Sequence, residues 1–342
     1  MRELSQADKL FFFERSFFTL DGLWMIEVEK VTNWETALNI DLTVWKNVLK
    51  IVIRRLKAYL NLVGNDLNAL VNILTFRWSI EGWGYKVLKR EQDKVKIVVN
   101  QCPYKGTMDR NPERTEKLPL ICRDMCIPLY KSVSKEFNKN VTLFRPLSMG
   151  IGDDYCEFSF SYEETAKDDN ILGDLTKNAR KISKEDKLFY FEKTFRTLDG
   201  MWMIESEKEF GWDTALKLDI IVWQKLYKIT FRRVKKYLKI SGNTLEDLVN
   251  ILSFIWNCEG NIHDIIEVGE NKFTISIVEC PYIEAMKRNP ERHNKIESIC
   301  KEMCVSYLRP VINEFNPEIE ITRDKFIGLG DVTCNIILSL KE

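Results

Sequence analysis

The chain opens with three stretches in which apolar residues recur at the spacing of an amphipathic helix. In the first stretch they stand three or four positions apart: Leu10, Phe13, Phe17 and Leu20. Two further stretches, at residues 34–60 and 65–79, continue the same period. Ser5 precedes the first stretch at the distance from Asp8 that is typical of an amino-terminal cap. The pattern therefore predicts three consecutive helices.

Beyond these helices the apolar period shortens to that of β-strands. Residues 85–89 and 94–99 predict a pair of strands, and residues 272–278 (KFTISIV) show the alternation more clearly. A helix follows over 117–137 and again over 295–315, and strand-like segments come after each of them. We predict an α+β fold in which a helical layer packs on a small antiparallel sheet.

The whole pattern occurs twice, with a shift of 178 residues. The segment TLDGLWMIE at 19–27 returns as TLDGMWMIE at 197–205, and no gap is needed to align the two copies. We therefore predict two tandem homologous domains, at 1–162 and 183–342, that pack as a pseudo-dimer within one chain. The charged stretch at 163–182 is the predicted linker.

Eight of the nine cysteines fall at matching positions of the two copies. The matched residues are Cys102, Cys122, Cys126 and Cys156 in the first copy, and Cys280, Cys300, Cys304 and Cys334 in the second. Four thiols kept in both copies are a pattern that zinc sites and iron–sulfur clusters use. The ninth, Cys258, aligns with Ile80 and is predicted to be an ordinary core residue.

The four cysteines of a copy belong to three separate elements. Cys102 lies in Cys-Pro-Tyr at a strand end, and Cys156 opens the last strand after Gly-x-Gly-Asp. Cys122 and Cys126 stand four residues apart on one helix, where Cβ atoms are ~5–6 Å apart. A disulfide needs Cβ atoms about 3.5–4.5 Å apart. Binding of both sulfurs to one metal or cluster is therefore the easier geometry.

The charge balance narrows the choice of partners. The chain carries 51 basic and 51 acidic residues, and no block of Lys or Arg favours a nucleic-acid partner. The amino terminus is too charged for a signal peptide, and no apolar run approaches the ~18 residues of a membrane span. We expect a cytoplasmic protein without a membrane partner, whose thiols stay reduced.

These motifs resemble a known family. The segment LDGLWMIE, the Cys-Pro-Tyr, the Cys-x-x-x-Cys helix and the closing Gly-Asp-x-x-Cys strand resemble the L-2-amino-thiazoline-4-carboxylate hydrolase-like family. That family is related to 4-vinyl-reductase-like and heme-NO-binding-like domains. The resemblance implies an α+β domain with a pocket between helices and sheet. It also implies two different functions, opening of a cyclic thiazoline or binding of metals, hydrophobic ligands or tetrapyrroles.

The residues leave four interpretations of the thiol sets open. We favour two [4Fe–4S] clusters per chain, used in redox or small-molecule chemistry. Structural zinc sites usually consist of two close pairs of thiols, whereas each copy has one close pair and two solitary cysteines. A bulkier cluster suits such scattered ligands better. A zinc-stabilised small-molecule-binding protein is the second. A cysteine-dependent hydrolase of a heterocyclic small molecule is the third, although no histidine is shared by the two copies to activate a thiol. Buried core cysteines are the fourth.

Further repeated residues are candidates for a pocket beside the thiols. They are Trp24, Arg54, Asp153, Trp202, Arg232 and Asp331. Repeated tryptophans usually belong to the core, and repeated charges usually fix helix packing. Arg114 and Arg292 are expected to cap the cysteine-bearing helix or to screen an anionic cluster. The expected partner is a small molecule or a redox protein.

Overall fold

The computed structural model describes residues 4–162 and 180–341. Most of the predicted linker, at 163–182, lies outside the described residues. Contacts between Cα atoms divide the chain into two compact units. We call them the Cys102 unit, Thr32–Glu205, and the Cys280 unit, Met1–Val31 together with Ser206–Glu342.

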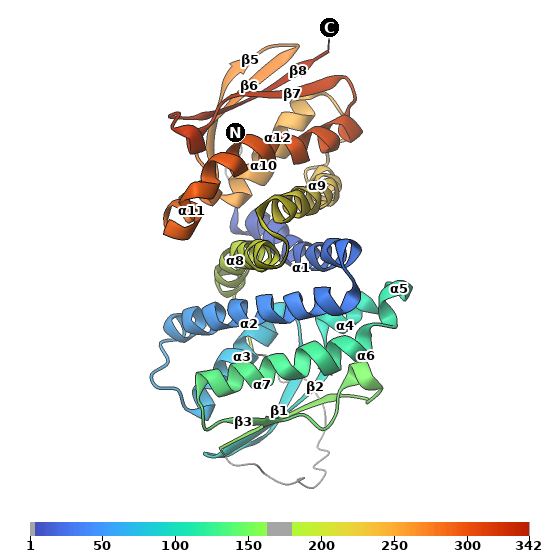
Figure 1. The fold of residues 1–342 in the computed structure, drawn as a ribbon, viewed down its shortest axis with the longest axis vertical. Coiled ribbons are helices and arrows are strands. Elements are labelled where there is room, and N and C mark those ends of the chain that lie inside the picture. Colours follow the sequence, from blue (N-terminus) through green and yellow to red (C-terminus); the bar gives the residue numbers. More distant parts are fainter. Residues whose placement is uncertain (1–3, 163–179, 342) are drawn as a thin grey trace. The chain divides into compact units, whose positions relative to one another are not determined.

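The Cys102 unit contains the predicted helices and strands of the first copy, except the opening helix (Figure 1). Its elements are α2 (Trp34–Tyr59), α3 (Leu67–Glu81), β1 (Gly84–Arg90), β2 (Lys94–Gln101), α4 (Pro103–Met108), α5 (Pro112–Thr115), α6 (Leu118–Leu120), η1 (Ile121–Cys126), α7 (Ile127–Phe137), β3 (Thr142–Phe144), η2 (Met149–Ile151), β4 (Cys156–Ser161) and most of α8 (Lys184–Phe210).

The Cys280 unit repeats this order with the opening helix of the chain added. Its elements are α1 (Gln6–Val31), α9 (Trp212–Tyr237), α10 (Leu245–Glu259), β5 (Ile262–Val268), β6 (Lys272–Glu279), α11 (Pro281–Lys287), η3 (Pro290–Lys295), α12 (Ile296–Phe315), β7 (Ile319–Lys325), η4 (Ile327–Leu329) and β8 (Cys334–Leu340).

Each unit contains one four-stranded antiparallel sheet. The strand orders are β1-β2-β4-β3 and β5-β6-β8-β7, so the two sheets have the same topology. Helices cover one face of each sheet (Figure 1). In the Cys102 unit the core forms where Trp78 of α3 packs on Phe158 of β4, with ring centroids 4.8 Å apart. The prediction of an α+β fold, with helices on a small antiparallel sheet in each of two domains, is confirmed.

The opening helix of each copy packs in the unit that the other copy builds. Helix α1 contacts α9 and α10, where Tyr237 donates a hydrogen bond to Asp8 at 2.9 Å. Helix α8 makes the equivalent contact in the Cys102 unit, where Tyr59 donates to Asp186 at 2.8 Å. The sequence modules 1–162 and 183–342 and the compact units are therefore different divisions of the chain.

The exchanged helices use matched contacts in both units. Phe11 stacks on Tyr237 and Phe189 stacks on Tyr59, each with ring centroids 4.0 Å apart. In the same way, Arg233 donates to the Thr19 hydroxyl and Arg55 to the Thr197 hydroxyl. Equivalent contacts at equivalent positions mean that both helices occupy the same kind of groove. The exchange is thus a repeated feature of the fold.

The cysteine-bearing helix of the first copy is not the continuous α-helix expected over 117–137. It consists of the short helix α6, the π-helical segment η1 and α7. Pro128 stands in the first turn of α7, where the lack of an N–H is tolerated. In the second copy η3 leads into a continuous α12, which has Ser306 at the matching position. A π-helical segment with i→i+5 bonds therefore holds the Cys122–Cys126 pair only in the Cys102 unit.

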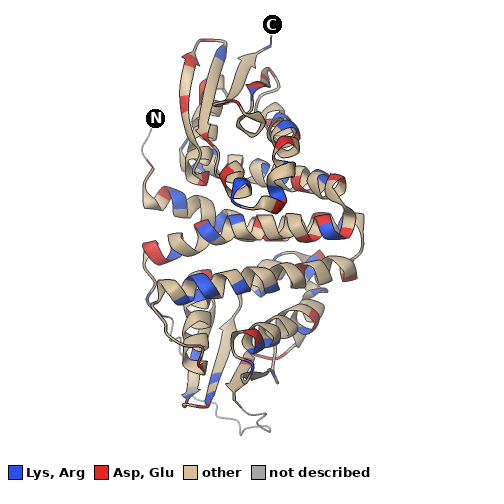
Figure 2. Cartoon of the chain, turned by 60° about the vertical axis from the view of Figure 1, so that its left-hand side comes forward, with Lys and Arg blue, Asp and Glu red and all other residues tan. Residues whose placement is uncertain are grey.

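Charges of both signs are spread over the helices and strands of both units (Figure 2). The distribution agrees with the zero net charge of the sequence. Within the described residues, no helix has the length and apolar character that would be needed to cross a membrane.

Candidate functional site

The four cysteines of the Cys102 unit lie where the sequence predicts. Cys102 follows β2 and caps α4, and its sulfur accepts a hydrogen bond from the Lys105 N–H at 3.5 Å. Cys122 and Cys126 lie on η1. Cys156 opens β4, and its sulfur accepts from the Met149 N–H at 3.3 Å. A strand end, a helix and a strand start thus supply the thiols.

The Gly-x-Gly motif before the last strand is shaped around one of these thiols. A Cβ atom placed on Gly150 would lie 2.2 Å from the Cys122 sulfur, and one on Gly328 would lie 2.2 Å from the Cys300 sulfur. Only glycine allows the helix and the loop to approach so closely. The second glycine of each motif has a positive φ, +111° at Gly152 and +103° at Gly330. The motif therefore brings the cysteine helix and the last strand together.

The thiols of the Cys102 unit are close enough to influence one another. Burial raises the pKa of Cys102 to about 12, and Cys126 and Cys156 add to the rise because neighbouring thiolates repel. Burial, followed by Cys126, raises the pKa of Cys122 to about 11. Cys102 and Cys122 are therefore protonated at neutral pH unless a cation takes the place of their protons.

The Cys280 unit repeats this arrangement. Burial, followed by Cys304, raises the pKa of Cys280 to about 12. Burial also raises the pKa of Cys304 to about 11, with Cys300 and Cys334 adding to the rise. The sulfur of Cys334 accepts a hydrogen bond from the Ile327 N–H at 3.1 Å, as Cys156 does from Met149. The same four positions are thus coupled in both units.

Each thiol set contains an arginine that the sequence analysis did not single out. Arg145 Nη1 lies 3.5 Å from the Cys126 sulfur, and Arg323 Nη2 lies 2.8 Å from the Cys334 sulfur. Burial alone would lower the pKa of Arg145, but Cys126 and Cys156 raise it above its ordinary value. The 178-residue repeat relates Arg145 to Arg323, so the signal needed to find them was present in the sequence.

Arg114 and Arg292, which are expected to cap the cysteine-bearing helix or to screen an anionic cluster, contact residues of neighbouring helices. The Arg114 guanidinium lies over the ring of Trp34, 6.0 Å from its centroid. Arg292 forms an ion pair with Glu207. Each contact joins the start of the cysteine-bearing segment to a neighbouring helix, and the arginines that contact the sulfurs are Arg145 and Arg323.

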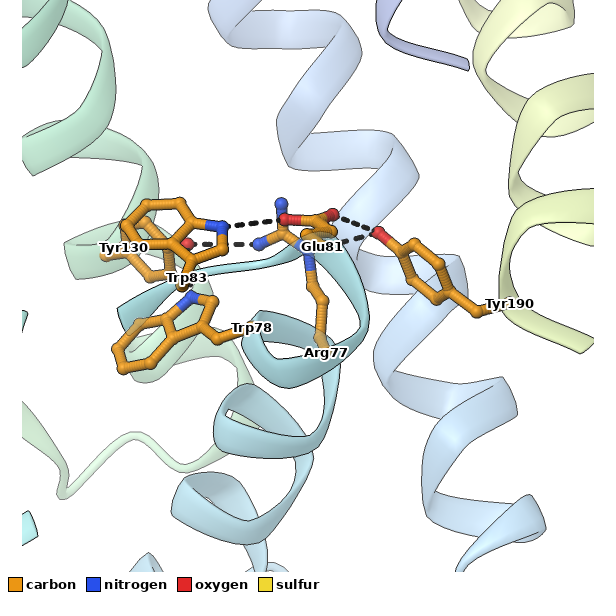
Figure 3. Close-up of polar contacts among 6 residues, drawn as sticks. All are labelled: Arg77, Trp78, Glu81, Trp83, Tyr130 and Tyr190. Carbon is orange, nitrogen blue, oxygen red and sulfur yellow. Dashed lines mark hydrogen bonds and ion pairs between the residues drawn. The ribbon is translucent and has the colours of Figure 1, made fainter. Parts of the chain in front are cut away.

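Beside the thiols of the Cys102 unit lies a buried polar network that begins at Tyr130 (Figure 3). The Tyr130 hydroxyl accepts hydrogen bonds from Arg77 Nη1 at 3.0 Å and from the Trp78 indole at 2.8 Å. Arg77 also forms a 2.9 Å ion pair with Glu81, and both side chains are almost wholly buried. Tyr190 of the exchanged helix α8 donates to Glu81. The exchanged helix therefore completes this network.

The Cys280 unit keeps the buried glutamate but not the arginine. Glu259 aligns with Glu81, whereas Ile255 stands where Arg77 does. Tyr227 of α9 donates a 2.9 Å hydrogen bond to Glu259, and Tyr307 of α12 packs on Tyr227 with ring centroids 4.9 Å apart. The surroundings of the two thiol sets therefore differ although the sets themselves match.

A cavity of about 630 Å³ opens beside the thiols of the Cys280 unit. Cys280 and Gly328 form part of its wall, together with Asp331, Glu284 and Lys287. Asp331 also accepts a hydrogen bond from the Phe326 N–H at 2.7 Å. A small polar molecule in this cavity would lie next to Cys280.

The six predicted pocket residues are not gathered in one place. Trp24 and Trp202 are fully buried in the exchanged helices α1 and α8. Arg54 and Arg232 are exposed on α2 and α9. The aspartates are close to the thiols. Asp331 lines the cavity, and its counterpart Asp153 accepts a hydrogen bond from the Ser148 N–H at 2.6 Å.

All nine cysteines are free thiols. In the described part of the chain, no group of three or more His, Cys, Asp or Glu side chains is already arranged to hold a metal ion. The chemistry of the donor set, four thiols in each unit, fits a soft metal or an iron–sulfur cluster. Cys258 is different, because it is buried in α10 and donates a weak hydrogen bond to the Asp8 carbonyl at 3.8 Å.

Comparison with known proteins places the chain in a family. The sequence profile described as a family of unknown function, DUF6125, matches twice, at residues 4–142 and 180–312. The chain belongs to the DUF6125 family. The two matches confirm the tandem duplication, and each one contains the exchanged helix and three of the four cysteines of its copy. No curated protein and no solved structure matches this DUF6125 chain.

Proposed function

We propose that each copy holds one iron–sulfur cluster on its four cysteines, so that the chain carries two clusters of the [4Fe–4S] type. The ligands would be Cys102, Cys122, Cys126 and Cys156 in one unit, and Cys280, Cys300, Cys304 and Cys334 in the other. When bound, such a cluster supplies a one-electron redox centre or a Lewis acid for a small molecule. The protein would act in the cytoplasm, with a redox protein or a small molecule as its partner.

The observation that supports this proposal is that both units place four cysteines at matching positions, with a glycine facing one sulfur and an arginine contacting another. Glycine is required opposite Cys122 and opposite Cys300, because any side chain would collide with the sulfur. A cysteine that only fills space in the core would not require a glycine opposite its sulfur, since alanine or serine could take its place. The arginine beside each set, Arg145 or Arg323, adds positive charge, which favours thiolates over thiols.

The cavity in the Cys280 unit supports a second candidate, a cysteine-dependent hydrolase of a heterocyclic small molecule. Cys280 and Asp331 lie on the wall of this cavity, as a nucleophile and an acid–base group would. The resemblance to the thiazoline carboxylate hydrolase-like family points to the same chemistry. This candidate requires no metal, so the two proposals separate on metal content.

Elemental analysis and a visible spectrum of protein purified without oxygen test the proposal. Two cubane clusters require about eight iron and about eight acid-labile sulfide atoms per chain, together with a band near 400 nm that bleaches on reduction. About two zinc ions per chain and no colour would make the sites structural instead. A metal-free chain that hydrolyses thiazoline carboxylates, and stops when Cys280 is changed to Ser, would favour the hydrolase.

A further inference from the structure

An arginine lies against each thiol set, and the one in the Cys102 unit is buried with few partners. Only 8% of Arg145 is exposed, and its guanidinium lies 3.7 Å from the centroid of the Phe158 ring. Within the described residues the guanidinium forms no ion pair with a carboxylate, and its Nε makes no hydrogen bond. Its polar contact is Nη1 with the Cys126 sulfur. A buried cation with so few partners is costly unless a negative charge arrives beside it.

Arg323 repeats the arrangement in the Cys280 unit. Its guanidinium lies 4.4 Å from the centroid of the Phe326 ring, and its Nη2 donates to the Cys334 sulfur. Its Nη1 donates to the Cys300 carbonyl at 2.7 Å, and its Nε, like that of Arg145, is buried without a hydrogen bond. The two arginines at matching positions thus share a buried Nε without a hydrogen bond and a contact with a cysteine sulfur.

We propose that Arg145 and Arg323 are positioning residues that raise the reduction potential of the two clusters by holding a positive charge against their cysteine ligands. The inference rests on the proposed function. Reduction adds one electron to a cluster that is already negative, and no bond forms or breaks. A fixed cation stabilises the more negative form more strongly, so the reduced cluster becomes easier to form. The Arg–sulfur contacts also orient the ligands.

The test is a redox titration with dithionite on protein whose iron content is known, followed by the visible band and by electron paramagnetic resonance. Arg145→Met should move the potential of one of the two clusters to a more negative value, and Arg323→Met should move the other. Arg145→Lys keeps a positive charge and should fall between Arg145→Met and the wild type. Arg309→Met, on the exposed side of α12, serves as the matched control and should leave both potentials unchanged.

The outcomes separate the inference from the proposed function. Variants that bind full iron and keep the wild-type potentials would overturn the role of the arginines, while the clusters would stand. A wild-type chain without iron would contradict the proposed function itself, so the iron content is measured before any titration. If Arg145→Met binds less iron, its potential is not comparable with that of the wild type, and the Arg145→Lys and Arg323→Met variants test the role of the arginines instead. A more negative potential in Arg323→Met supports the inference, and unchanged potentials in both variants contradict it.

Discussion

The Cys102 unit and the Cys280 unit share one set of residues and differ in the layer behind it. Both keep four cysteines, a glycine against one sulfur and an arginine against another. Behind the thiols, the Cys102 unit buries an Arg77–Glu81 ion pair closed by Tyr190, whereas the Cys280 unit buries Glu259 with Tyr227. The duplication has therefore preserved what touches the sulfurs and has allowed what surrounds them to change.

The largest expected effect comes from removing one ligand. Cys126→Ser should abolish the cluster of the Cys102 unit and lower the iron content of the chain by about half, from about eight atoms to about four. Cys304→Ser should do the same in the Cys280 unit. Cys258→Ala is the control, because this buried cysteine lies outside both sets and should leave the iron content unchanged. An equal loss in all three variants would show that the metal is not held by the matched sets.

The buried ion pair should make the Cys102 unit more sensitive to one substitution. Arg77→Ile installs the residue found at 255 but leaves Glu81 buried without its cation. Breaking a buried pair in this way should lower the free energy of unfolding by about 3–5 kcal/mol. The matched variant Ile255→Met conserves volume and should cost less than about 1.5 kcal/mol. Denaturant unfolding followed by circular dichroism checks both values. Equal losses of unfolding free energy in the two variants would mean that the buried ion pair stabilises its unit no more than ordinary core packing does.

The glycine that faces the sulfur should be the next most sensitive position. Gly150→Ala places a Cβ atom 2.2 Å from the Cys122 sulfur and should cost about 1–3 kcal/mol of unfolding free energy, together with iron at that site. Gly106→Ala, in helix α4 of the same unit, meets nothing within 4 Å and should be neutral or slightly stabilising. Iron content and denaturant midpoints of the two variants distinguish them. A Gly150→Ala protein with full iron would contradict the close approach.

A smaller, pH-dependent difference concerns how the exchanged helices are held. Glu27 of α1 pairs with Lys225, while its counterpart Glu205 accepts a hydrogen bond from Asn47. Burial alone would raise the pKa of Glu27, but hydrogen bonds from Lys225 and Lys30 lower it below its ordinary value of 4.5. A lowered pKa means that the pair stabilises the fold above about pH 4.5 and stops contributing as the pH falls through the lowered value.

Lys225→Asn should therefore cost up to about 1 kcal/mol at neutral pH and progressively less as the pH falls below about 4.5. Asn47→Lys makes the opposite change beside Glu205 and serves as the matched variant. Unfolding curves at pH 7 and pH 3 measure the difference. A loss that is the same at both pH values would assign the effect to packing and not to charge.

The smallest effect is expected from cutting the chain between the two copies, which should not make them dissociate. Cleavage at a protease site inserted between residues 163 and 179 breaks the covalent link between the two copies. Each compact unit, however, contains a helix from the other copy. Because the α1–α9 and α8–α2 contacts remain, the cut halves should still run as one particle in size-exclusion chromatography. Separation into two halves would contradict the helix exchange.

The sequence predicted the elements and the thiol positions well, because both depend on local patterns and on the repeat. It did not predict the exchange of α1 and α8. Periodicity identifies the buried face of α1 through residues such as Phe13 and Phe17, but the two copies offer nearly identical grooves. Nothing local distinguishes a groove in the same copy from its equivalent in the other copy.

The residues that the sequence analysis missed were missed for different reasons. Arg145 and Arg323 are repeated, so comparing every aligned position of the two copies would have found them. Tyr190 could not be found in this way, because its counterpart is Phe12. Its role in the network depends on the helix exchange, which brings it to Glu81. A function that arises only from tertiary packing leaves no trace in the repeat.

Native mass spectrometry of protein purified without oxygen tests the central claim most directly, because it counts the bound groups on each chain. The account predicts a mass excess of two [4Fe–4S] clusters on the wild-type chain and of one cluster on Cys126→Ser and on Cys304→Ser. A wild-type chain that carries two zinc ions, or no bound group, would contradict it.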